Sequence, residues 1–518
     1  MKKIGLDFGT TNSIICYPDG GDLKPWQLGG AGGDFYVPSL LSVQREDGTM
    51  EIGRAARANL GDDDYRAYLG FKMLLGEDNP ERLAARGYGD FSPRAAAAAY
   101  LRELIQSYQR EQNIPELEGV VLTVPEIWVR EGRHRAREEL DDLCREIGLP
   151  ILRLLSEPVA AAVYFMQAFR QREQRAFDGH LLVCDYGGGT LDLSLSKVEG
   201  NDITVLESAG FGNASQTIGK AGLAFDEAVL QRLYASNGRA PEHDARWFRN
   251  LKEFEEQKIS KRESITKVLK DYIRNPKADK RLFKVDGLEV QCSDLAEVFD
   301  TLIKPNLQRS LQEMQAHLQT YRIDTRDGQN FRILLVGGFS AFHLVQHTVR
   351  EFFGSRTDLD TRFNTVMDLT DTALAIAKGA ALVAQETIRV HPKCPINLGI
   401  QATDPNTHED KNLPILRRGT PIKSDTIVQY SDKRFRVSKA AALDKLALTL
   451  WVDDGEGQVN YIPLGGRLRN YLPTDSAQDA WEIGFSVSQN LLFNLHIRVA
   501  GTDNEKISRL GDLSANIS

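Results

Sequence analysis

The sequence predicts a duplicated, two-lobe α/β domain followed by a β domain. One pattern, a strand ending in an aspartate, a Gly/Thr-rich turn and a second strand, occurs twice, at residues 3–17 and 181–197. Helical and apolar strand patterns alternate up to about residue 390, where the helical pattern stops. Because 518 residues exceed what one hydrophobic core supports, we expect separate domains.

Composition restricts the class of protein. Hydrophobic residues make up 42% and charged residues 26% of the chain, which are ordinary values for a globular protein. The net charge of -8 is spread along the chain, which argues against nucleic acid or an anionic membrane as a partner. No apolar stretch approaches the ~18 residues of a membrane helix, no secretory signal precedes the first strand, and the cysteines are too far apart to predict disulfides or a zinc site. We therefore expect a cytoplasmic protein. We also expect it to be a monomer.

Each copy of the repeated pattern is predicted to be a β-hairpin with a polar turn. The strands are residues 3–8 and 13–17 in the first copy and residues 181–185 and 191–197 in the second. The residues that carry chemistry are Asp7, Gly9, Thr10, Thr11 and Asn12 in the first hairpin, and Asp185, Gly187, Gly188, Gly189, Thr190 and Asp192 in the second. Since the halves of a duplicated domain face each other, we expect the two turns to meet across a cleft.

Two such turns suit a nucleoside triphosphate with its metal. Glycines leave backbone N–H groups free to approach phosphate oxygens, and threonine hydroxyls add donors. Asp7 and Asp185 would hold Mg²⁺ through its retained waters. A single turn of this kind could equally be an ordinary tight turn, but two of them in the same strand context make that interpretation weak.

A third candidate element follows a buried strand at residues 333–336. The strand ends in Gly337, Gly338 and Phe339, before a helix that starts near Phe342. Such a turn lets an adenine or ribose lie against bare backbone at the start of a helix. Taken alone, a Gly-Gly turn between a strand and a helix is often only a packing turn.

The remaining periodic segments complete the prediction. Helices are expected at residues 94–112, 131–147, 158–170 and 245–275, and from Asp294 as N-cap to residue 317, with a strand at residues 120–124. In the β domain, strands are expected at residues 425–430, 446–452, 480–487 and 491–499.

Three motifs resemble those of the seventy-kilodalton heat-shock (DnaK-type) family. DFGTTNS, LLVCDYGGGTLDLS and ILLVGGFS are similar to its first phosphate, second phosphate and adenosine motifs, in the same order and at about the same spacing. PINLGI and IGFSVSQNLLFNLHIRV resemble stretches of its peptide-binding β domain. The resemblance implies an actin-like, sugar-kinase-like ATPase fold followed by a β-sandwich-type domain. It also implies ATP or ADP with Mg²⁺ as ligands, with K⁺ as a further candidate ion.

The resemblance also implies domain boundaries. Residues 1–388 would form the nucleotide-binding domain, with lobe I at about 1–183 plus 360–388 and lobe II at about 184–359. Residues 389–396 would be a linker, since its two prolines discourage regular structure. Residues 397–518 would form a β domain resembling the family's substrate-binding domain. The sequence stops at Ser518 without a predicted helical lid.

The resemblance assigns the catalytic roles. Lys72 in GFKMLLG matches the family's catalytic lysine, which reaches the γ-phosphate region. Glu157 in SEPVAAA matches the carboxylate that positions metal-bound or attacking water, and Asp185 and Thr190 complete the catalytic set. From the sequence alone, Lys72 could instead be a solvated helix lysine, and Glu157 could simply cap a helix.

Further matches border the adenine and the domain interface. Glu255 and Lys258 resemble a helix pair beside adenine, but at i, i+3 they could be a surface ion pair. Arg137, or alternatively Arg135, resembles an arginine that works with Pro158 in signalling between domains.

The sequence departs from the family where the base would bind. Ile259, Phe339 and Ala341 stand where the family usually has arginine, a small hydroxyl residue and arginine. The linker VHPKCPI lacks the family's aspartate-flanked leucine run, and Leu223 and Ala224 replace an acidic pair.

Three functions follow from these patterns. The first is an ATPase that couples nucleotide state to peptide or protein binding in its β domain, with a co-chaperone or exchange factor as further partner. The second is a nucleotide-binding scaffold that hydrolyses little and recruits a fixed partner through that domain. The third, more distant, is a small-molecule kinase.

Overall fold

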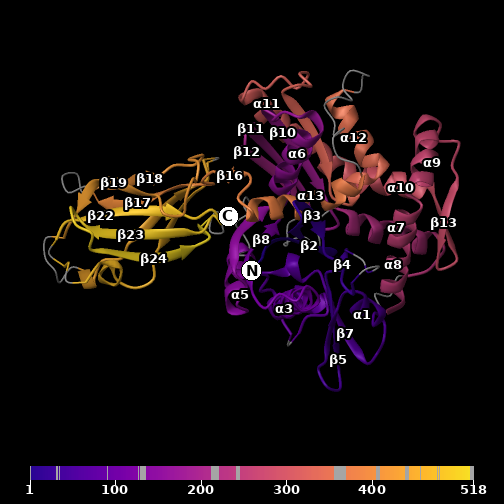
Figure 1. Ribbon diagram of the computed structural model, residues 1–518, viewed down its shortest axis with the longest axis horizontal. Helices are drawn as coiled ribbons and strands as arrows, with labels where there is room; N and C mark the ends of the chain where they lie inside the picture. Colours follow the sequence, from indigo (N-terminus) through magenta and orange to yellow (C-terminus); the bar gives the residue numbers. More distant parts are fainter. Residues whose placement is uncertain are drawn as a thin grey trace. The chain divides into compact units, whose positions relative to one another are not determined.

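The computed structural model describes most of the chain as two compact units (Figure 1). The described residues are 2–30, 33, 35–89, 91–126, 128, 136–211, 221–240, 245–354, 369–403, 409–437, 443–455, 457–474, 476–477 and 479–513. The α/β unit contains Met1–Ile127, Leu140–Ile203 and Glu207–Arg389, and the β unit contains Trp128–Glu139, Thr204–Leu206 and Val390–Ser518.

The first large sheet of the α/β unit is built around the N-terminal hairpin. Its strands are β1 (Lys2–Phe8), β2 (Asn12–Asp19), β3 (Asp22–Pro25), β4 (Val37–Pro38), β8 (Leu117–Val124) and β9 (Ile151–Ser156). The order is β3-β2-β1-β8-β9, with β4 beside β2. Strands β1 and β2 are antiparallel, whereas β8 runs parallel to both β1 and β9.

The second large sheet repeats this arrangement. Its strands are β10 (Gly179–Tyr186), β11 (Leu191–Glu199), β12 (Asp202–Phe211), β15 (Phe331–Val336) and β16 (Arg389–His391), in the order β15-β10-β11-β12-β16. Again the hairpin strands β10 and β11 are antiparallel, and a later strand, β15, runs parallel to the first of them. The order β8-β1-β2-β3 thus corresponds to β15-β10-β11-β12, as a duplicated domain requires.

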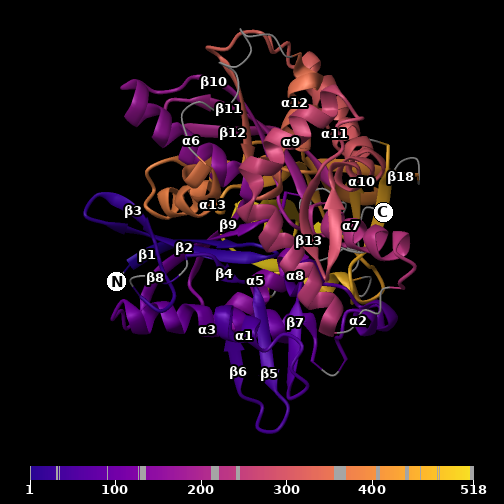
Figure 2. The same cartoon turned by 90° about the vertical axis from the view of Figure 1, so that its right-hand side faces the viewer.

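Two helices pack between the sheets. Helices α6 (Glu157–Glu173) and α13 (Leu369–Ala384) contact each other, α13 lies on β1, and α6 lies on β10; Figure 2 shows both helices between the two sets of strands. A Cβ atom on Gly379 would lie 2.6 Å from the carbonyl carbon of Ala160, and one on Gly5 would lie 2.5 Å from the Ala377 oxygen. Glycine therefore allows backbone to touch backbone at both contacts.

Smaller elements complete the α/β unit. A three-stranded sheet has the order β6-β5-β7, from β5 (Leu40–Gln44), β6 (Met50–Ile52) and β7 (Tyr65–Leu69), and β13 (Arg281–Val285) pairs with β14 (Leu288–Gln291). The helices are α1 (Gly53–Ala58), α2 (Pro80–Ala85), α3 (Pro93–Glu111), α5 (Ala136–Glu146), α7 (Gly222–Ser236), α8 (Ala245–Ser260), α9 (Arg262–Arg274), α10 (Cys292–Val298), α11 (Lys304–Thr320) and α12 (His343–Phe353); the first turn of α5, up to Glu139, is assigned to the β unit. Short 3₁₀ turns are η1 (Phe71–Leu74) and η3 (Phe339–Ala341), and η2 (Phe299–Ile303) is a π turn.

Two helix predictions were wrong in detail. Residues 245–275 form two helices, because the chain leaves helical geometry at Lys261, just after the Ser260 hydroxyl donates to the carbonyl oxygen of Gln257. Asp294 is not an N-cap: Gln291 is, and the Asp294 side chain accepts the Gln291 N–H at 2.9 Å in a capping box. The predicted helix up to residue 317 is divided between α10, η2 and α11.

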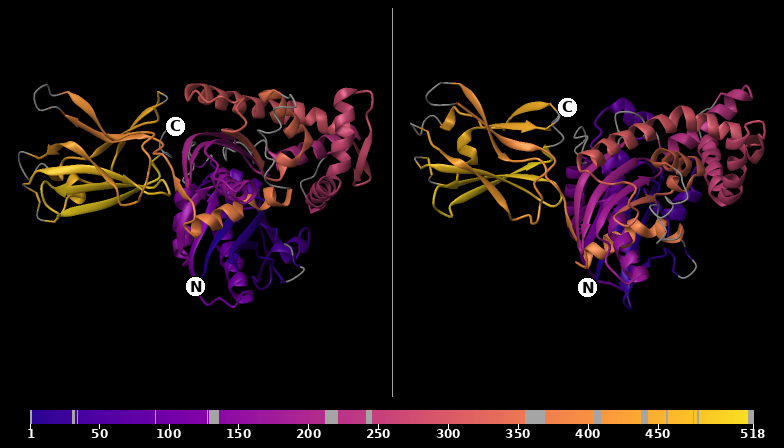
Figure 3. Two further views of the ribbon diagram at one scale, coloured as in Figure 1. Left: turned by 45° about the horizontal axis from the view of Figure 1, so that its top comes forward. Right: turned by 90° about the horizontal axis from the view of Figure 1, so that it is seen from above.

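The β unit consists of two four-stranded sheets, which Figure 3 shows as stacked layers. One has the order β18-β17-β20-β21 and the other β19-β22-β23-β24. The strands are β17 (Asn397–Thr403), β18 (Asp410–Leu416), β19 (Val428–Phe435), β20 (Thr449–Asp453), β21 (Val459–Pro463), β22 (Trp481–Val487), β23 (Phe493–Val499) and β24 (Glu505–Gly511), with a 3₁₀ turn at η6 (Leu468–Tyr471). Ile400 and Leu450 of one sheet and Phe485 and Leu495 of the other belong to one buried core.

The structure corrects several strand predictions. Residues 425–427 and 446–448 lie outside strands, and residues 389–391, expected to be irregular, form the edge strand β16. Strands β18 and β24 were not predicted, because most of their side chains are exposed or half-buried and leave little apolar pattern.

The close contact between α6 and α13 gives a stability prediction. Gly379→Ala places a methyl group against the backbone of Ala160, so we expect it to lower the free energy of unfolding by about 3 kcal/mol. Helix propensity alone predicts the opposite sign, a gain of ~1 kcal/mol. Chemical denaturation measures the difference, with Gly89→Ala as control because a Cβ atom there would have nothing within 4 Å. A Gly379→Ala protein as stable as Gly89→Ala would contradict this packing.

Candidate functional site

The first turn is held by hydrogen bonds from the next segment of the chain. The Ser39 N–H donates to the Thr11 carbonyl at 2.9 Å, and the Ser39 hydroxyl donates to the Gly9 carbonyl at 2.7 Å. A Cβ atom on Gly9 would collide with the carbonyl oxygen of Asn12, so the turn is too tight for a side chain there. The backbone of the turn is thereby fixed from one side.

The second turn is held by the start of helix α7. The Gly187 N–H donates to the Thr190 carbonyl at 3.0 Å and closes the turn. The N–H groups of Gly222 and Leu223, in the first turn of α7, donate to the Gly187 and Gly188 carbonyls at 3.2 and 2.9 Å. These N–H groups lie at the start of a helix and have no hydrogen-bond acceptor within it, so the carbonyl groups of the turn supply their acceptors.

The two turns meet, as the sequence predicted. A Cβ atom on Gly188 would lie 2.5 Å from the Thr11 Oγ1 atom, and one on Gly189 would lie 2.8 Å from the Thr10 Oγ1 atom. Only glycine fits at either position without moving a threonine. The hydroxyls of one hairpin therefore face the bare backbone of the other.

Acidic side chains surround this meeting point. Asp7, at the end of β1, accepts a hydrogen bond from the Thr123 hydroxyl of β8 at 3.1 Å. Asp185 of β10 lies opposite Asp192 of β11, and all three aspartates are buried. Asn12 begins β2, one turn away from Asp7.

Lys72 and Glu157 form a buried ion pair beside these aspartates. The Lys72 ammonium bonds to the Glu157 carboxylate, and their side chains are 1% and 10% exposed. Lys72 is therefore not a solvated helix lysine; it lies in the 3₁₀ turn η1. Glu157 opens helix α6, but its carboxylate is engaged by the lysine, so capping does not account for it.

Burial and mutual repulsion disfavour the ionised form of the aspartates. Burial, with a smaller contribution from the Glu157 charge, raises the pKa of Asp7 to about 7, and the Lys72 ammonium opposes this rise. Burial also raises the pKa of Asp185 well above its ordinary value, helped by the charges of Glu157 and Asp192. A divalent cation would relieve this repulsion.

The Asp7 and Asp185 carboxylates suit an Mg²⁺ ion that is also bound by water and phosphate better than they suit a metal ion bound by protein side chains alone. Among the described residues, no group of three or more His, Cys, Asp or Glu side chains is arranged to enclose a metal ion. Mg²⁺ usually keeps several waters and uses one or two carboxylates together with substrate phosphates. Asp7 and Asp185 would contribute these carboxylates.

The third motif packs directly on the second. Gly337 has φ +83°, and a Cβ atom there would collide with the Asp185 carboxylate and lie 2.7 Å from the Tyr186 carbonyl oxygen. The Ser340 hydroxyl donates to the Cys184 carbonyl at 3.3 Å. Gly338 has open space at its Cβ position. Glycine at 337 is thus required both by its backbone conformation and by the approach of the acid.

Aromatic rings gather beside this motif. Phe339 is 4% exposed. The centre of its ring lies 5.0 Å from the ring centre of Tyr186, 5.3 Å from that of Phe225 and 5.5 Å from that of Phe342. Ile259, by contrast, is 63% exposed. The Phe339 side chain is therefore part of the core rather than free to contact a base.

Lys258 pairs with Asp226 rather than with Glu255. Its ammonium lies 2.6 and 2.7 Å from the two Asp226 oxygens and 5.4 Å from the centre of the Phe339 ring. Burial raises the pKa of Asp226 to about 7, and Lys258 opposes this rise. The sequence did not indicate this pair, because 32 positions separate the two residues. Thr123 was missed for the same reason.

Arg137 lies in α5 and is 2% exposed. Arg135 lies outside the described residues.

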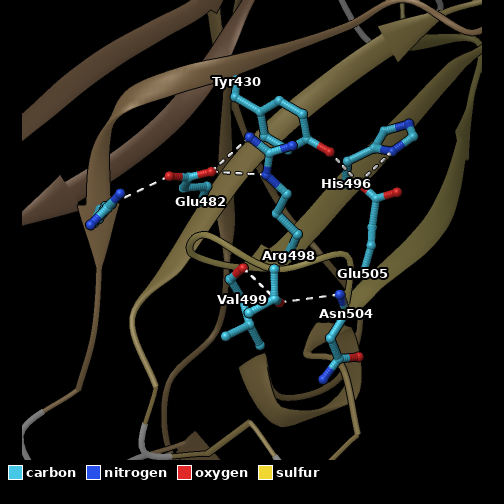
Figure 4. A network of polar contacts seen from close by, with 9 residues as sticks. Tyr430, Glu482, His496, Arg498, Val499, Asn504 and Glu505 are labelled. Carbon is cyan, nitrogen blue, oxygen red and sulfur yellow. Dashed lines mark hydrogen bonds and ion pairs between the residues drawn. The ribbon is translucent and has the colours of Figure 1, made fainter.

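A second polar cluster lies on the β unit (Figure 4). The His496 Nε2 atom is 2.8 Å from the Ser486 Oγ atom, and its Nδ1 atom is 3.2 Å from Glu505 Oε1. This order of serine, histidine and carboxylate occurs in hydrolases. Here, however, Ser486 lies within strand β22 and is 2% exposed, so a substrate carbonyl cannot reach its hydroxyl.

The same cluster ties together the four strands of its sheet. The Tyr430 hydroxyl donates to Glu505, and the Arg498 guanidinium lies 3.8 Å from the centre of the Tyr430 ring (Figure 4). Arg498 also pairs with Glu482 at 2.8 Å. These contacts connect β19, β22, β23 and β24, which makes the cluster structural.

Comparison with known proteins decides the family. The family model described as "Hsp70 protein" matches residues 3–391. The chain belongs to the Hsp70 family.

Curated relatives of this Hsp70-family chain are bacterial chaperones. It is 29% identical over 373 residues to a chaperone protein HscA homolog from Laribacter hongkongensis, which covers 68% of the chain and 54% of the relative. It is 27% identical over 433 residues to the chaperone protein dnaK3 of Synechococcus elongatus (77% and 53%), and 28% identical over 424 residues to the chaperone protein HscA of Cronobacter sakazakii (77% and 61%). The matched region spans about half the length of the first two relatives. Within the described part of this Hsp70-family chain, no helix is both long and apolar enough to cross a bilayer.

The raised pKa of Asp7 gives a pH-dependent prediction for this Hsp70-family protein. Its value is 3.8 without the fold and about 7 within it, so ionisation of Asp7 increasingly opposes folding as pH rises between these values. Without metal and nucleotide, we expect Asp7→Asn to raise the melting temperature by several degrees at pH 8 and by less at pH 5. Thermal unfolding at both values tests this, with the exposed Asp63→Asn as control. Destabilisation by Asp7→Asn at pH 8 would contradict the electrostatics described above.

Proposed function

We propose that the α/β unit binds ATP or ADP with Mg²⁺ and hydrolyses ATP slowly, and that the chain acts as a cytoplasmic, monomeric chaperone. The observation that carries this proposal is the meeting of two Gly/Thr turns beside buried aspartates and the Lys72–Glu157 pair. The corresponding strand orders of the two large sheets support an actin-like, two-lobe ATPase fold. The names of the relatives support a chaperone role.

Each residue has a defined part in this proposal. The N–H groups of Gly188 and Gly189 and the hydroxyls of Thr10, Thr11 and Thr190 would contact phosphate oxygens, while the Gly187 N–H closes the turn on the Thr190 carbonyl. Mg²⁺ would neutralise phosphate charge. Hydrolysis needs mainly positioning and charge neutralisation, so buried, pre-oriented groups suit it.

Lys72 and Glu157 would have the two remaining catalytic roles, which are stabilising charge and orienting water. The ammonium of Lys72 would stabilise charge on the γ-phosphoryl group, and the Glu157 carboxylate would orient the attacking water. Their ion pair holds the two side chains next to each other. Gly337 and Gly338 would bring the nucleoside close to the backbone.

The β unit would bind a peptide or protein client, and its two stacked sheets would form the β-sandwich of this binding domain. A co-chaperone or exchange factor would be a further partner, and K⁺ a further ion. The linker would comprise residues 389–396, between a nucleotide-binding domain at 1–388 and a β domain at 397–518.

Two observations favour the alternative, a nucleotide-binding scaffold with little hydrolysis. Lys258, expected beside the base, is bound by Asp226, and Phe339 is buried in an aromatic cluster. The nucleoside end would then contribute less to binding than the phosphate end. Both functions use Asp7 and Asp185, but only the ATPase requires Lys72 and Glu157.

Single-turnover hydrolysis separates the two functions. We expect Lys72→Ala to slow hydrolysis of bound ATP roughly 100-fold, because it removes the ammonium that stabilises the transferring phosphoryl group. The exposed Lys277→Ala is the control and should hydrolyse ATP at the wild-type rate. A thermal shift with Mg-ATP would show that the Lys72→Ala protein is folded. Equal rates in the two variants would favour the scaffold.

Coupling between nucleotide and client binding can be tested at residues 389–396. If ATP alters the conformation of this segment, limited proteolysis there should differ with ATP, with ADP and without nucleotide. Mass spectrometry of the fragments locates the cuts. The same cleavage pattern and rate in all three states would contradict coupling through this segment.

A further inference from the structure

Glu126 is a buried carboxylate that takes no part in the site described above. It follows strand β8 and is 4% exposed. Each of its oxygens accepts one serine hydroxyl: Ser156 Oγ donates to Oε2, and Ser208 Oγ donates to Oε1 at 2.6 Å. Burying a carboxylate is costly unless its oxygens are bonded, and here both are.

The two serines come from different halves of the α/β unit. Ser156 is the last residue of β9 in the first large sheet, whereas Ser208 lies in β12 of the second. All three residues belong to the α/β unit. Glu126 therefore joins the two halves that carry the two phosphate turns.

Ser156 is committed to Glu126 rather than to its own helix. It occupies the N-cap of α6, where a serine side chain usually accepts a backbone N–H, but it makes no such bond. The second residue of the helix is Pro158, which has no N–H to offer. The hydroxyl thus fixes the start of α6 to the end of β8.

The next residue after Ser156 is Glu157, the partner of Lys72. A shift of the Ser156 hydroxyl would move the first residue of α6, and with it the carboxylate beside Asp7 and Asp185. Glu126 is close to this centre in the chain as well, because Thr123, three residues earlier, donates to Asp7.

The strand that leads to Glu126 is firmly held. Strand β8 pairs in parallel with β1 and with β9, so its end is held by two neighbours. The strand of Ser208, β12, lies near the end of the α/β unit: the Arg389 N–H donates to the Asn201 carbonyl at 2.9 Å, and its guanidinium pairs with Asp202 at 2.9 Å. Asp202 is the first residue of β12.

From these contacts we infer that Glu126 is a positioning residue for ATP hydrolysis. By bonding Ser208 of β12 and Ser156 at the start of α6, Glu126 makes the position of the Glu157 carboxylate depend on the position of β12. It touches neither nucleotide nor metal; it sets where the water-orienting carboxylate lies. This inference rests on the proposed ATPase function.

Ser208→Ala tests the link at a half-buried member, where misfolding is not expected. We expect the single-turnover rate of ATP hydrolysis to fall about fivefold, because the Glu157 carboxylate is no longer held in a fixed position relative to the second large sheet. The affinity for Mg-ATP, measured by titration, should not change, since no phosphate or metal contact is removed. Ser208→Thr, which keeps the hydroxyl, should restore the rate.

Two further variants complete the experiment. Ser196→Ala removes a buried serine from the adjacent strand β11 and is the matched control, with the wild-type rate expected. Glu126→Gln should slow hydrolysis, and adding Ser208→Ala to it should slow it no further, because both changes break one link.

The outcomes distinguish this inference from the function on which it rests. If wild-type protein hydrolyses ATP and Ser208→Ala does so at the same rate, or if Ser208→Ala loses affinity for Mg-ATP instead of rate, the positioning role is overturned alone. If wild-type protein binds Mg-ATP but does not hydrolyse it, the ATPase proposal and this inference both fail. Additive losses in the double variant would also overturn the link.

Discussion

The α/β unit depends on one electrostatic constraint: buried carboxylates are held together where two turns meet. Asp7, Glu157, Asp185 and Asp192 lie out of water around this point, and the Lys72 ammonium compensates part of their charge. Such an arrangement is unfavourable by itself, as the raised pKa values of Asp7 and Asp185 indicate. In the proposed function, a divalent cation bound together with phosphates would relieve this repulsion.

The packing of the two halves makes this constraint possible. Backbone contacts at Gly5 and Gly379 bring α13 onto β1 and against α6, and α6 begins at Glu157. The Ser156–Glu126–Ser208 contact adds a polar connection between the halves at the same place. Rigid elements therefore position the acids, while the β unit has a separate core of its own.

The sequence predicted those features that depend on local pattern. The two hairpins, their Gly/Thr turns and the strand before Gly337 follow from short motifs, and the duplicated pattern predicted that the turns would meet. Contacts between distant residues left no such signal: nothing in the spacing of Asp226 and Lys258, or of Glu126 and Ser208, links them. The edge strand β16 was missed because its pairing with a distant strand overrides weak local preferences there. The helix break at Lys261 coincides with a local hydrogen bond from the Ser260 hydroxyl, which helical periodicity does not reveal. Strands β18 and β24 show too few buried side chains for periodicity to reveal them.

Calorimetric titration of the full chain with ATP, with and without Mg²⁺, tests the central claim most directly. If the two turns form one metal-triphosphate site, Mg-ATP should bind at one equivalent per chain, ATP with EDTA should bind much more weakly, and Asp185→Asn should remove most of the dependence on Mg²⁺. Absence of binding heat and of a thermal shift with Mg-ATP would contradict it. So would binding of the same strength in wild-type and Asp185→Asn protein whether or not Mg²⁺ is present.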